Sequence, residues 1–329
     1  MGTDRPDEFD TIRRLLMPLA GHPAARGLLD DVAVLEPPPG RTLVLTHDTL
    51  VAGVHFRPDD PPELIARKLL RVNLSDLAAK GAQPFGYLMS CAWPKSCDWA
   101  WRAAFGRGLA QDQTTYGLAL LGGDTVSTPG PLTLGATLIG WGLPGRTPRR
   151  STAQVGDALL VTGTIGDGGL GLMATGLNPP SFEPGDAEWL ADRYRLPQPR
   201  CELADLIAAE ATASADISDG LVADVGHIAQ ASGLAAEIDL GLMPISTAAH
   251  RWVTAQDNRS DALVRLATSG DDYEIAFTLA PERVEAVRIA ANALGCPVTV
   301  IGQMMEGEGV TTSLGLRRLE IDMPGWRHR

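Results

Sequence analysis

Short apolar runs alternate with longer amphipathic stretches along this chain, and the pattern predicts strands and helices in turn. Residues 41–50 read as a strand with Leu43-Val44-Leu45 as its apolar core. Residues 62–80 read as a helix, since Pro61-Pro62 opens a stretch with apolar residues at spacings of three and four. Further strands are expected at 87–92, 119–121, 132–141, 158–162, 213–217, 235–240, 274–279 and 297–301, and helices at 8–19, 98–116, 170–175 and 221–232. This alternation predicts an α/β or mixed α+β fold.

The stretch 142–150, GLPGRTPRR, is the predicted domain boundary because it is rich in Gly, Pro and Arg. A length of 329 residues also favours two domains of ordinary size. We therefore expect an N-terminal domain at 1–145 and a C-terminal domain at 146–329.

Composition narrows the class of protein. A net charge of −12 argues against a nucleic-acid surface. Only three of the 28 basic residues are lysines, and none follows a Gly-rich turn as a P-loop requires. The four cysteines form no CxxC pair and are expected to be reduced and packed. With a polar N-terminus and no apolar run of membrane length, we expect a cytoplasmic protein without membrane contact.

Six short segments place aspartate on or beside Gly, Ser, Thr or another Asp. They are Leu29-Asp30-Asp31, Thr46-His47-Asp48-Thr49, Asn73-Leu74-Ser75-Asp76, Gly122-Gly123-Asp124-Thr125, Asp216-Ile217-Ser218-Asp219-Gly220 and Gly270-Asp271-Asp272-Tyr273. Repeated hard oxygen ligands suit Mg²⁺ and phosphate better than zinc or a covalent nucleophile.

Asp76 gives the clearest local argument. It continues the stripe of Ile65, Leu69 and Val72 along the predicted helix, so it projects from the face that should be buried. A buried carboxylate needs a cation or another strong partner. Either a metal ion or a salt bridge with Arg71 meets that need, and the helix alone does not decide between them.

The other segments each have an ordinary structural alternative. Thr46 and Asp48 share one face of a strand near its end, which suits a ligand site or a turn. The glycines of 122–125 allow a backbone to approach a ligand or form a tight turn. In 216–220, Asp219 can be a simple N-cap, although a helix N-terminus also binds anions.

Two further features carry less weight. Residues 166–171 match GxGxxG, but prolines interrupt the region where the second strand of a dinucleotide-binding fold should end, so we expect only a tight or phosphate-facing loop. His55 lies just past the aspartate strand, and a lone histidine is more often structural.

Taken together, the segments resemble the thiamine-monophosphate kinase family, within the superfamily of aminoimidazole-ribonucleotide synthetase. The matching motifs are DDVAVL (30–35), THDTLVAGVHF (46–56), NLSDLAAKGAQP (73–84), GGDT (122–125), RRS (149–151), DISDGL (216–221) and SGDDYE (269–274). They cover almost the whole chain in order.

The resemblance implies an ATP-dependent, Mg²⁺-assisted phosphorylation of thiamine monophosphate to thiamine diphosphate. It also implies a two-domain aminoimidazole-ribonucleotide synthetase-like fold, with N-terminal sheets paired in a homodimer. Asp48 and Asp76 would be the central catalytic ligands. By motif position the site residues would be Asp31, Thr46, His47, Asp48, Asp76, Asp124, Asp216 and Asp219 for several Mg²⁺ ions; Gly123, Asp124, Arg150 and Ser218 for ATP; and His55, Asp271 and Trp326 for the substrate.

The sequence departs from the family pattern at three places. Leu29 replaces the glycine before Asp30-Asp31. His47 stands where Ser or Thr is usual, so a metal contact there is either through its backbone carbonyl or absent. Asp271 replaces a glutamate.

Two other functions stay open. A related ATP-dependent synthetase would use another acceptor, although His55 and Trp326 suit the thiamine kinases. A non-catalytic acidic metal-binding protein is the third hypothesis, and no EF-hand loop supports it.

Overall fold

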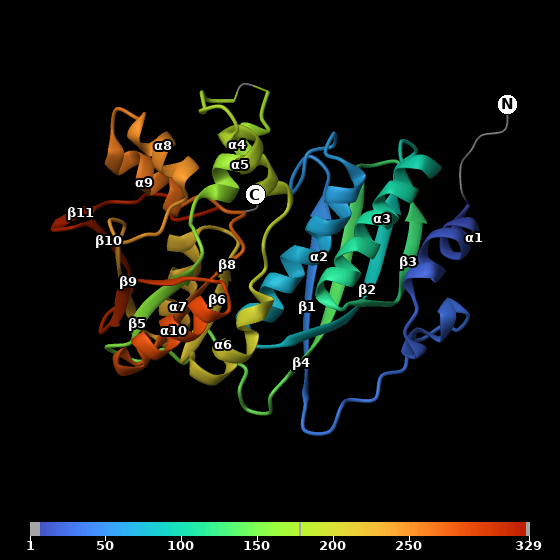
Figure 1. The fold of residues 1–329 in the computed structure, drawn as a ribbon, viewed down its shortest axis with the longest axis horizontal. Coiled ribbons are helices and arrows are strands. Elements are labelled where there is room, and N and C mark those ends of the chain that lie inside the picture. The colour runs from blue at the N-terminus through green and yellow to red at the C-terminus, as the bar shows by residue number, and fades with distance from the viewer. Residues whose placement is uncertain (1–6, 178, 327–329) are drawn as a thin grey trace. The chain divides into compact units, whose positions relative to one another are not determined.

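The computed structural model describes residues 7–177 and 179–326, which form two compact units. Unit 1 comprises Met1–Leu77 and Gln83–Pro144, and unit 2 comprises Ala78–Ala82 and Gly145–Arg329. Each unit is a sheet with helices, so the predicted mixed α/β class is confirmed (Figure 1).

Unit 1 is built on a four-stranded sheet with the order β1-β4-β2-β3. Its strands are β1 Thr42–Val51, β2 Gln83–Trp93, β3 Ala119–Ser127 and β4 Thr133–Gly142. β4 is antiparallel to both β1 and β2, whereas β2 and β3 are parallel. The parallel pair requires a crossover, and α3 (Trp99–Tyr116) supplies it.

Two helices, α2 (Pro62–Ala79) and α3, cover one face of this sheet. Phe105 of α3 packs edge-on against Trp93 of β2, with ring centroids 5.5 Å apart. α3 also lies very close to α2, because a Cβ added at Gly108 would be 2.2 Å from the carbonyl oxygen of Glu63. The helices therefore bury the sheet face that they cover.

The opposite face of the sheet, called here the outer face, keeps apolar side chains exposed. Leu43 is 46% exposed and Leu45 is 57% exposed. The interpretation of Leu43-Val44-Leu45 as the core of the strand is therefore wrong within one chain. Alternation places residues 43 and 45 away from the helices. Leu88 and Val126 on β2 and β3 are also exposed.

The predicted N-terminal helix at 8–19 is broken into short pieces. These are α1 Glu8–Thr11, the π-helical η1 Ile12–Leu16 and the 3₁₀ turn η2 Met17–Leu19. Phe9 is exposed, whereas Leu15 is buried against Gly106 of α3. Pro18 lacks the backbone N–H that a regular helix would use there. A further 3₁₀ segment, η3, spans Pro23–Leu28.

Unit 2 contains a seven-stranded mixed sheet with the order β11-β10-β7-β9-β5-β8-β6. Its strands are β5 Ala158–Thr162, β6 Ala213–Ile217, β7 Ala235–Asp239, β8 Glu274–Leu279, β9 Val298–Met305, β10 Gly309–Leu314 and β11 Arg317–Leu319. Its helices are α4 Asp167–Ala174, α5 Asp186–Arg195, α6 Ala204–Glu210, α7 Leu221–Ser232, α8 Thr247–Thr254, α9 Arg259–Ala267 and α10 Val284–Ala293, with 3₁₀ turns η4 Cys201–Leu203 and η5 Pro281–Arg283.

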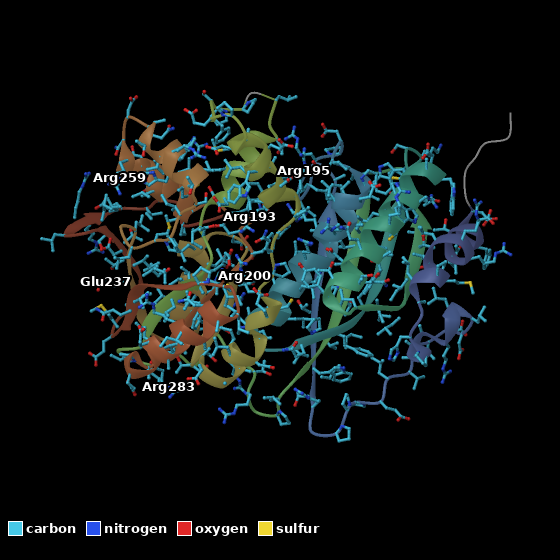
Figure 2. The ribbon with its side chains drawn as sticks, viewed as in Figure 1. Arg193, Arg195, Arg200, Glu237, Arg259 and Arg283 are labelled. Carbon is cyan, nitrogen blue, oxygen red and sulfur yellow. The ribbon has the colours of Figure 1, made fainter. Side chains whose placement is uncertain are left out.

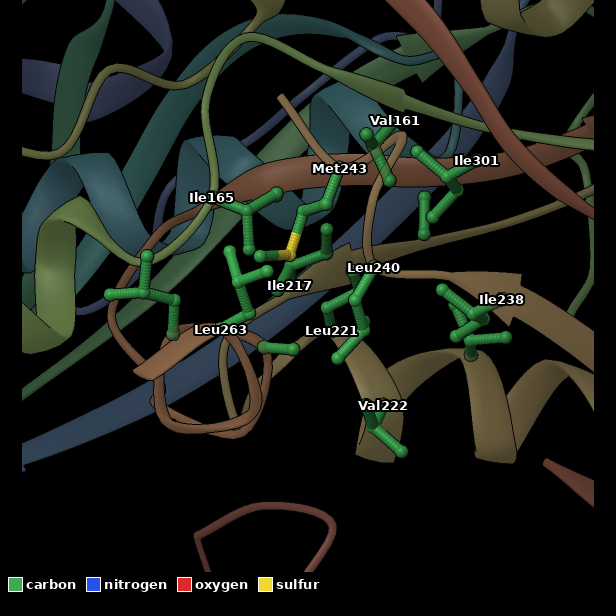
Figure 3. Close-up of a cluster of buried hydrophobic side chains, with 14 of the residues drawn as sticks. Val161, Ile165, Ile217, Leu221, Val222, Ile238, Leu240, Met243, Leu263 and Ile301 are labelled. Atoms are coloured by element: carbon green, nitrogen blue, oxygen red, sulfur yellow. The ribbon is translucent and has the colours of Figure 1, made fainter. Parts of the chain in front are cut away.

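The central strands of unit 2 are buried on both faces. Along β5, Val161 joins a core with Ile217, Leu221 and Leu263 (Figure 3), whereas Leu160 joins a second core on the other side. Every residue of β5, β6 and β8 is buried, as expected for strands covered on both faces. The predicted bounds of these three strands and of α7 are confirmed.

Three of the four cysteines are buried and Cys201 is partly buried, and all four are free thiols, as predicted. Among the described residues, no helix combines the length and apolar character that crossing a membrane requires.

Candidate active site

The strongest candidate site lies where β1 meets α2 in unit 1. The hydroxyl of Thr46 donates a hydrogen bond to the carboxylate of Asp76. The backbone N–H of Asp48 donates to Oδ1 of Asn73 at 3.0 Å, and Nδ2 of Asn73 donates to the Leu69 carbonyl at 3.0 Å. These bonds fix the strand against the helix on the side that carries both aspartates.

The carboxylates of Asp48 and Asp76 are close enough for the charge of one to affect the other. Burial and, as a smaller effect, the negative charge of Asp76 together raise the pKa of Asp48 to about 6. Arg71, considered above as a partner for Asp76, binds Asp112 through Nε and Nη2 at 2.6 and 3.0 Å. A pair of close carboxylates of this kind suits a divalent cation.

His47 and Asp124 lie on the outer face of the sheet. Paired residues of neighbouring strands point to the same side, and the register pairs His47 with Thr137 and Asp124 with Ser90. Nδ1 of His47 lies 2.9 Å from Oγ1 of Thr137. Within one chain, therefore, the side chains of His47 and Asp124 point away from the side that holds Asp48.

The segment 122–125 is part of a strand and not a turn, contrary to the prediction that the strand ends at residue 121. Gly123 has φ of 148°, and a Cβ there would lie 1.8 Å from the carbonyl oxygen of Met89. The glycine thus permits close pairing with β2, so this close approach is to a neighbouring strand.

Asp31 and His55 lie at the ends of loops in unit 1. Asp31 is exposed in the segment after η3, and its N–H donates to Oδ1 of Asp30 at 2.9 Å. Asp30 forms an ion pair with Arg26, which lowers the pKa of Asp30. His55 accepts a hydrogen bond at Nδ1 from the N–H of Val51 at 3.0 Å, which closes the turn after β1.

The loop 217–220 in unit 2 is organised by a residue that sequence reasoning missed. Oδ2 of Asp224 accepts hydrogen bonds from the N–H groups of Ser218, Asp219 and Gly220 at 3.0, 3.0 and 3.2 Å. The interpretation of Asp219 as the N-cap of α7 is therefore wrong, because Gly220 occupies the N-cap position. Asp224 instead binds the amides of the preceding loop from inside the helix. An acidic residue in the first helical turn was the available signal.

Asp224 is buried beside other charged groups. Its pKa is raised to about 7 by burial and by the charge of Asp219, while backbone hydrogen bonds and Arg150 act in the opposite direction. Ligand atoms of Asp219, Asp224 and His227 all lie within 4.8 Å of one another. Loop 217–220 therefore brings Ser218 and Asp219 together with Arg150 in one charged region. Asp216 is buried in β6, opposite Ile275 of β8.

Asp271 is held against this loop. Its backbone N–H donates to the Ser218 carbonyl at 2.9 Å. The neighbouring Asp272 accepts hydrogen bonds from the N–H groups of Gly166 and Gly168 at 2.7 and 2.9 Å. Because the protein's own carboxylate uses these amides of the GxGxxG segment, they are not available to a dinucleotide. The structure supports the tight-loop interpretation.

Trp326 borders a groove of about 1350 Å³ beside α7 and β10. The backbone N–H of Trp326 donates to the Asp219 carbonyl at 2.9 Å, and the residue is 58% exposed. Asp219 and His227 also line the groove. In unit 2, therefore, backbone hydrogen bonds join Asp271 to Ser218 and Trp326 to Asp219, so these residues predicted for substrate, ATP and metal are neighbours.

The fold agrees with comparisons to known proteins. Residues 29–141 match the N-terminal domain of AIR synthase related proteins, and residues 154–315 match the C-terminal domain of the same group. Both domains of this class are therefore present, in order, in one chain.

More similar relatives define the family. Thiamine-monophosphate kinase of Caulobacter vibrioides is 48% identical over 325 residues, covering 98% of this chain and 91% of that protein. The kinase of Escherichia coli is 39% identical over 303 residues, covering 92% and 91%. The chain belongs to the thiamine-monophosphate kinase family.

Solved structures agree. Thiamine-monophosphate kinase from Stenotrophomonas maltophilia superposes with a TM-score of 0.82 at 38% identity, covering 93% of this chain and 96% of that one. AaThiL complexed with AMPPCP and TMP superposes with a TM-score of 0.78 at 30% identity, covering 98% and 97%.

Proposed function

We propose that this chain transfers the terminal phosphoryl group of ATP to thiamine monophosphate and so forms thiamine diphosphate. Family membership supports this reaction, as does the relative that binds AMPPCP and TMP. The observation in this chain that carries the proposal is the pair Asp48 and Asp76, held together by Thr46 and Asn73.

The donor set fits Mg²⁺. Carboxylate oxygens are its preferred protein ligands, and burial together with the charge of Asp76 raises the pKa of Asp48, which a bound cation would counteract. Thr46, Asp48 and Asp76 would hold ions in unit 1. The further ligands proposed by motif position are Asp31, the backbone carbonyl of His47, Asp124, Asp216 and Asp219. Bound Mg²⁺ would neutralise charge on the phosphates.

The acceptor needs little activation by the protein. A phosphate monoester is already ionised near neutral pH, so the difficulty is to align two anions. The site residues would therefore act by positioning and charge compensation. We assign ATP contacts to Gly123, Asp124, Arg150 and Ser218, and contacts with thiamine monophosphate to His55, Asp271 and Trp326.

We also propose that 1–145 binds metal and ATP and forms a homodimer through its sheet, while 146–329 supplies the tail that lines the substrate site. The exposed apolar outer face supports the dimer. Asp124 lies on this outer face, whereas Asp48 of the same chain lies on the opposite face. The cytoplasmic location stays a prediction.

The central test replaces each aspartate of the pair with asparagine. We expect D48N and D76N each to lower kcat by about 100-fold or more at saturating Mg²⁺-ATP, because the amide binds a divalent ion weakly. D98N is the matched control, since the carboxylate of Asp98 caps α3 by accepting from the N–H of Trp101 and is not assigned to the metal site. Near-wild-type turnover by both D48N and D76N would contradict the assignment.

The choice of acceptor separates the alternatives. ATP consumption that depends on thiamine monophosphate supports the kinase. Consumption that requires a different acceptor would favour a related synthetase, and no consumption with any acceptor would favour a metal-binding protein.

A further inference from the structure

Asp272 lies next to the proposed substrate residue Asp271, and its carboxylate is bound inside the protein. Asp272 is 1% exposed. Its Oδ2 accepts from the N–H of Gly166 and its Oδ1 from the N–H of Gly168, at 2.7 and 2.9 Å. The side chain thereby ties loop 268–273 to the start of α4.

The residues on both sides of Asp272 have left-handed backbones, with φ of 70° at Asp271 and 52° at Tyr273. Residues other than glycine are strained in this conformation, and such strain persists only where the surrounding structure enforces it. The N–H groups of Asp271 and Tyr273 donate to the carbonyls of Ser218 and Ile217, at 2.9 and 2.8 Å. Three consecutive residues are thus attached to two different loops.

Glycines let these loops lie in backbone contact. A Cβ at Gly168 would be 2.1 Å from the Asp271 carbonyl oxygen, and a Cβ at Gly270 would be 2.4 Å from that of Ser218. The loop cannot shift toward either neighbour. Its backbone conformation is therefore set by the contacts around Asp272.

A second anchor follows at Glu274, the first residue of β8. Arg200 and Arg193 both bind this fully buried carboxylate, Arg193 through Nη2 at 3.2 Å, and the hydroxyl of Thr162 donates to it at 2.6 Å. Figure 2 shows the two arginines near one another in unit 2. Loop 268–273 is thus held firmly at its C-terminal end as well.

We propose that Asp272 is a positioning residue for the phosphate acceptor, because it holds Asp271 in its left-handed conformation against Ser218. The proposal rests on the proposed function through the assignment of Asp271 to the thiamine monophosphate site. The carboxylate of Asp272 binds the protein's own amides, those of Gly166 and Gly168.

The test is D272N, which keeps the shape but turns an amide NH₂ toward a backbone N–H. We expect KM for thiamine monophosphate to rise about tenfold, with KM for ATP unchanged within about twofold. D157N is the matched control, because Asp157 is also buried and accepts from the N–H of Gln154 and the hydroxyl of Thr212 elsewhere in unit 2. It should lower thermal stability without changing either KM.

Hydrogen exchange supplies a readout without substrate. The amides of Asp271 and Tyr273 should exchange faster in D272N than in wild type or D157N. A wild-type KM for thiamine monophosphate in folded D272N would overturn the proposal, as would equal KM changes in D272N and D157N.

If D272N does not fold, R193K weakens the second anchor while Arg200 still holds Glu274. It should raise the same KM about threefold, and an unchanged KM would overturn the proposal. A wild-type enzyme inactive with thiamine monophosphate would instead overturn the proposed function, which is a separate result.

Discussion

At the scale of single residues, Asp48 shows how placement alters an ordinary carboxyl group. Burial and the charge of Asp76 raise its pKa to about 6 in the folded chain, against its ordinary value of 3.8. The folded state therefore favours the protonated form. Without metal, this group contributes stability below about pH 4, and that contribution is lost as the pH rises through about 6.

We predict that D48N removes this pH dependence in protein treated with EDTA. The free energy of unfolding of D48N relative to that of wild type should increase between pH 4 and pH 7.5. The increase should be smaller than about 3 kcal/mol, because Asp48 is only partly buried. Denaturant titrations at both pH values measure the difference. A difference independent of pH would contradict the prediction. Added Mg²⁺ should stabilise wild type but not D48N above pH 6.

At the scale of elements, β3 depends on a single glycine. A Cβ at Gly123 would overlap the Met89 carbonyl of β2 at 1.8 Å, whereas the nearest atom to a Cβ at Gly122 is Cδ2 of Leu88 at 3.4 Å. Adjacent glycines in the same strand therefore have different roles: Gly123 is required for strand pairing and Gly122 is not.

Alanine substitutions test this difference. G123A should lower the free energy of unfolding by about 2 kcal/mol or more, because the pairing of β2 with β3 must open. G122A should change it by less than about 1 kcal/mol. Thermal and urea unfolding of the two variants compare the positions directly, and equal losses would show that pairing in β3 is not limited at Gly123.

At the scale of the whole molecule, the outer face of the unit 1 sheet carries exposed apolar side chains that the proposed homodimer would cover. Leu43, Leu45, Leu88 and Val126 are all between 38% and 57% exposed in the single chain. Helices α2 and α3 cover the other face of the sheet. In the proposed dimer, the same face of a second copy would cover these exposed side chains.

We predict that wild type sediments as a dimer and that L45E sediments as a monomer, because an unpaired charge buried in such an interface is strongly unfavourable. I289E is the matched control, since Ile289 is 62% exposed on α10 in unit 2. Analytical ultracentrifugation measures both. A monomeric wild type, or a dimeric L45E, would contradict the prediction.

Local patterns predicted much of the fold. The bounds of the strand 213–217 and of the helix 221–232, which ends at the left-handed Gly233, were predicted from the local sequence. The breaks in 8–19, the exposure of Leu43 and the strand through 122–125 depended on which surfaces other elements cover. Periodicity does not contain that information.

For the site, the sequence by itself determined the chemistry: the clustered oxygen ligands, and Asp76 on the inward stripe of α2. Only the tertiary structure decided which aspartates meet. Strand register separated Asp124 from Asp48, and packing placed Asp224 where its carboxylate binds the amides of Ser218, Asp219 and Gly220. The reason is physical: residue type fixes which ion a side chain can bind, but the direction of that side chain depends on pairing and packing between segments far apart in the chain.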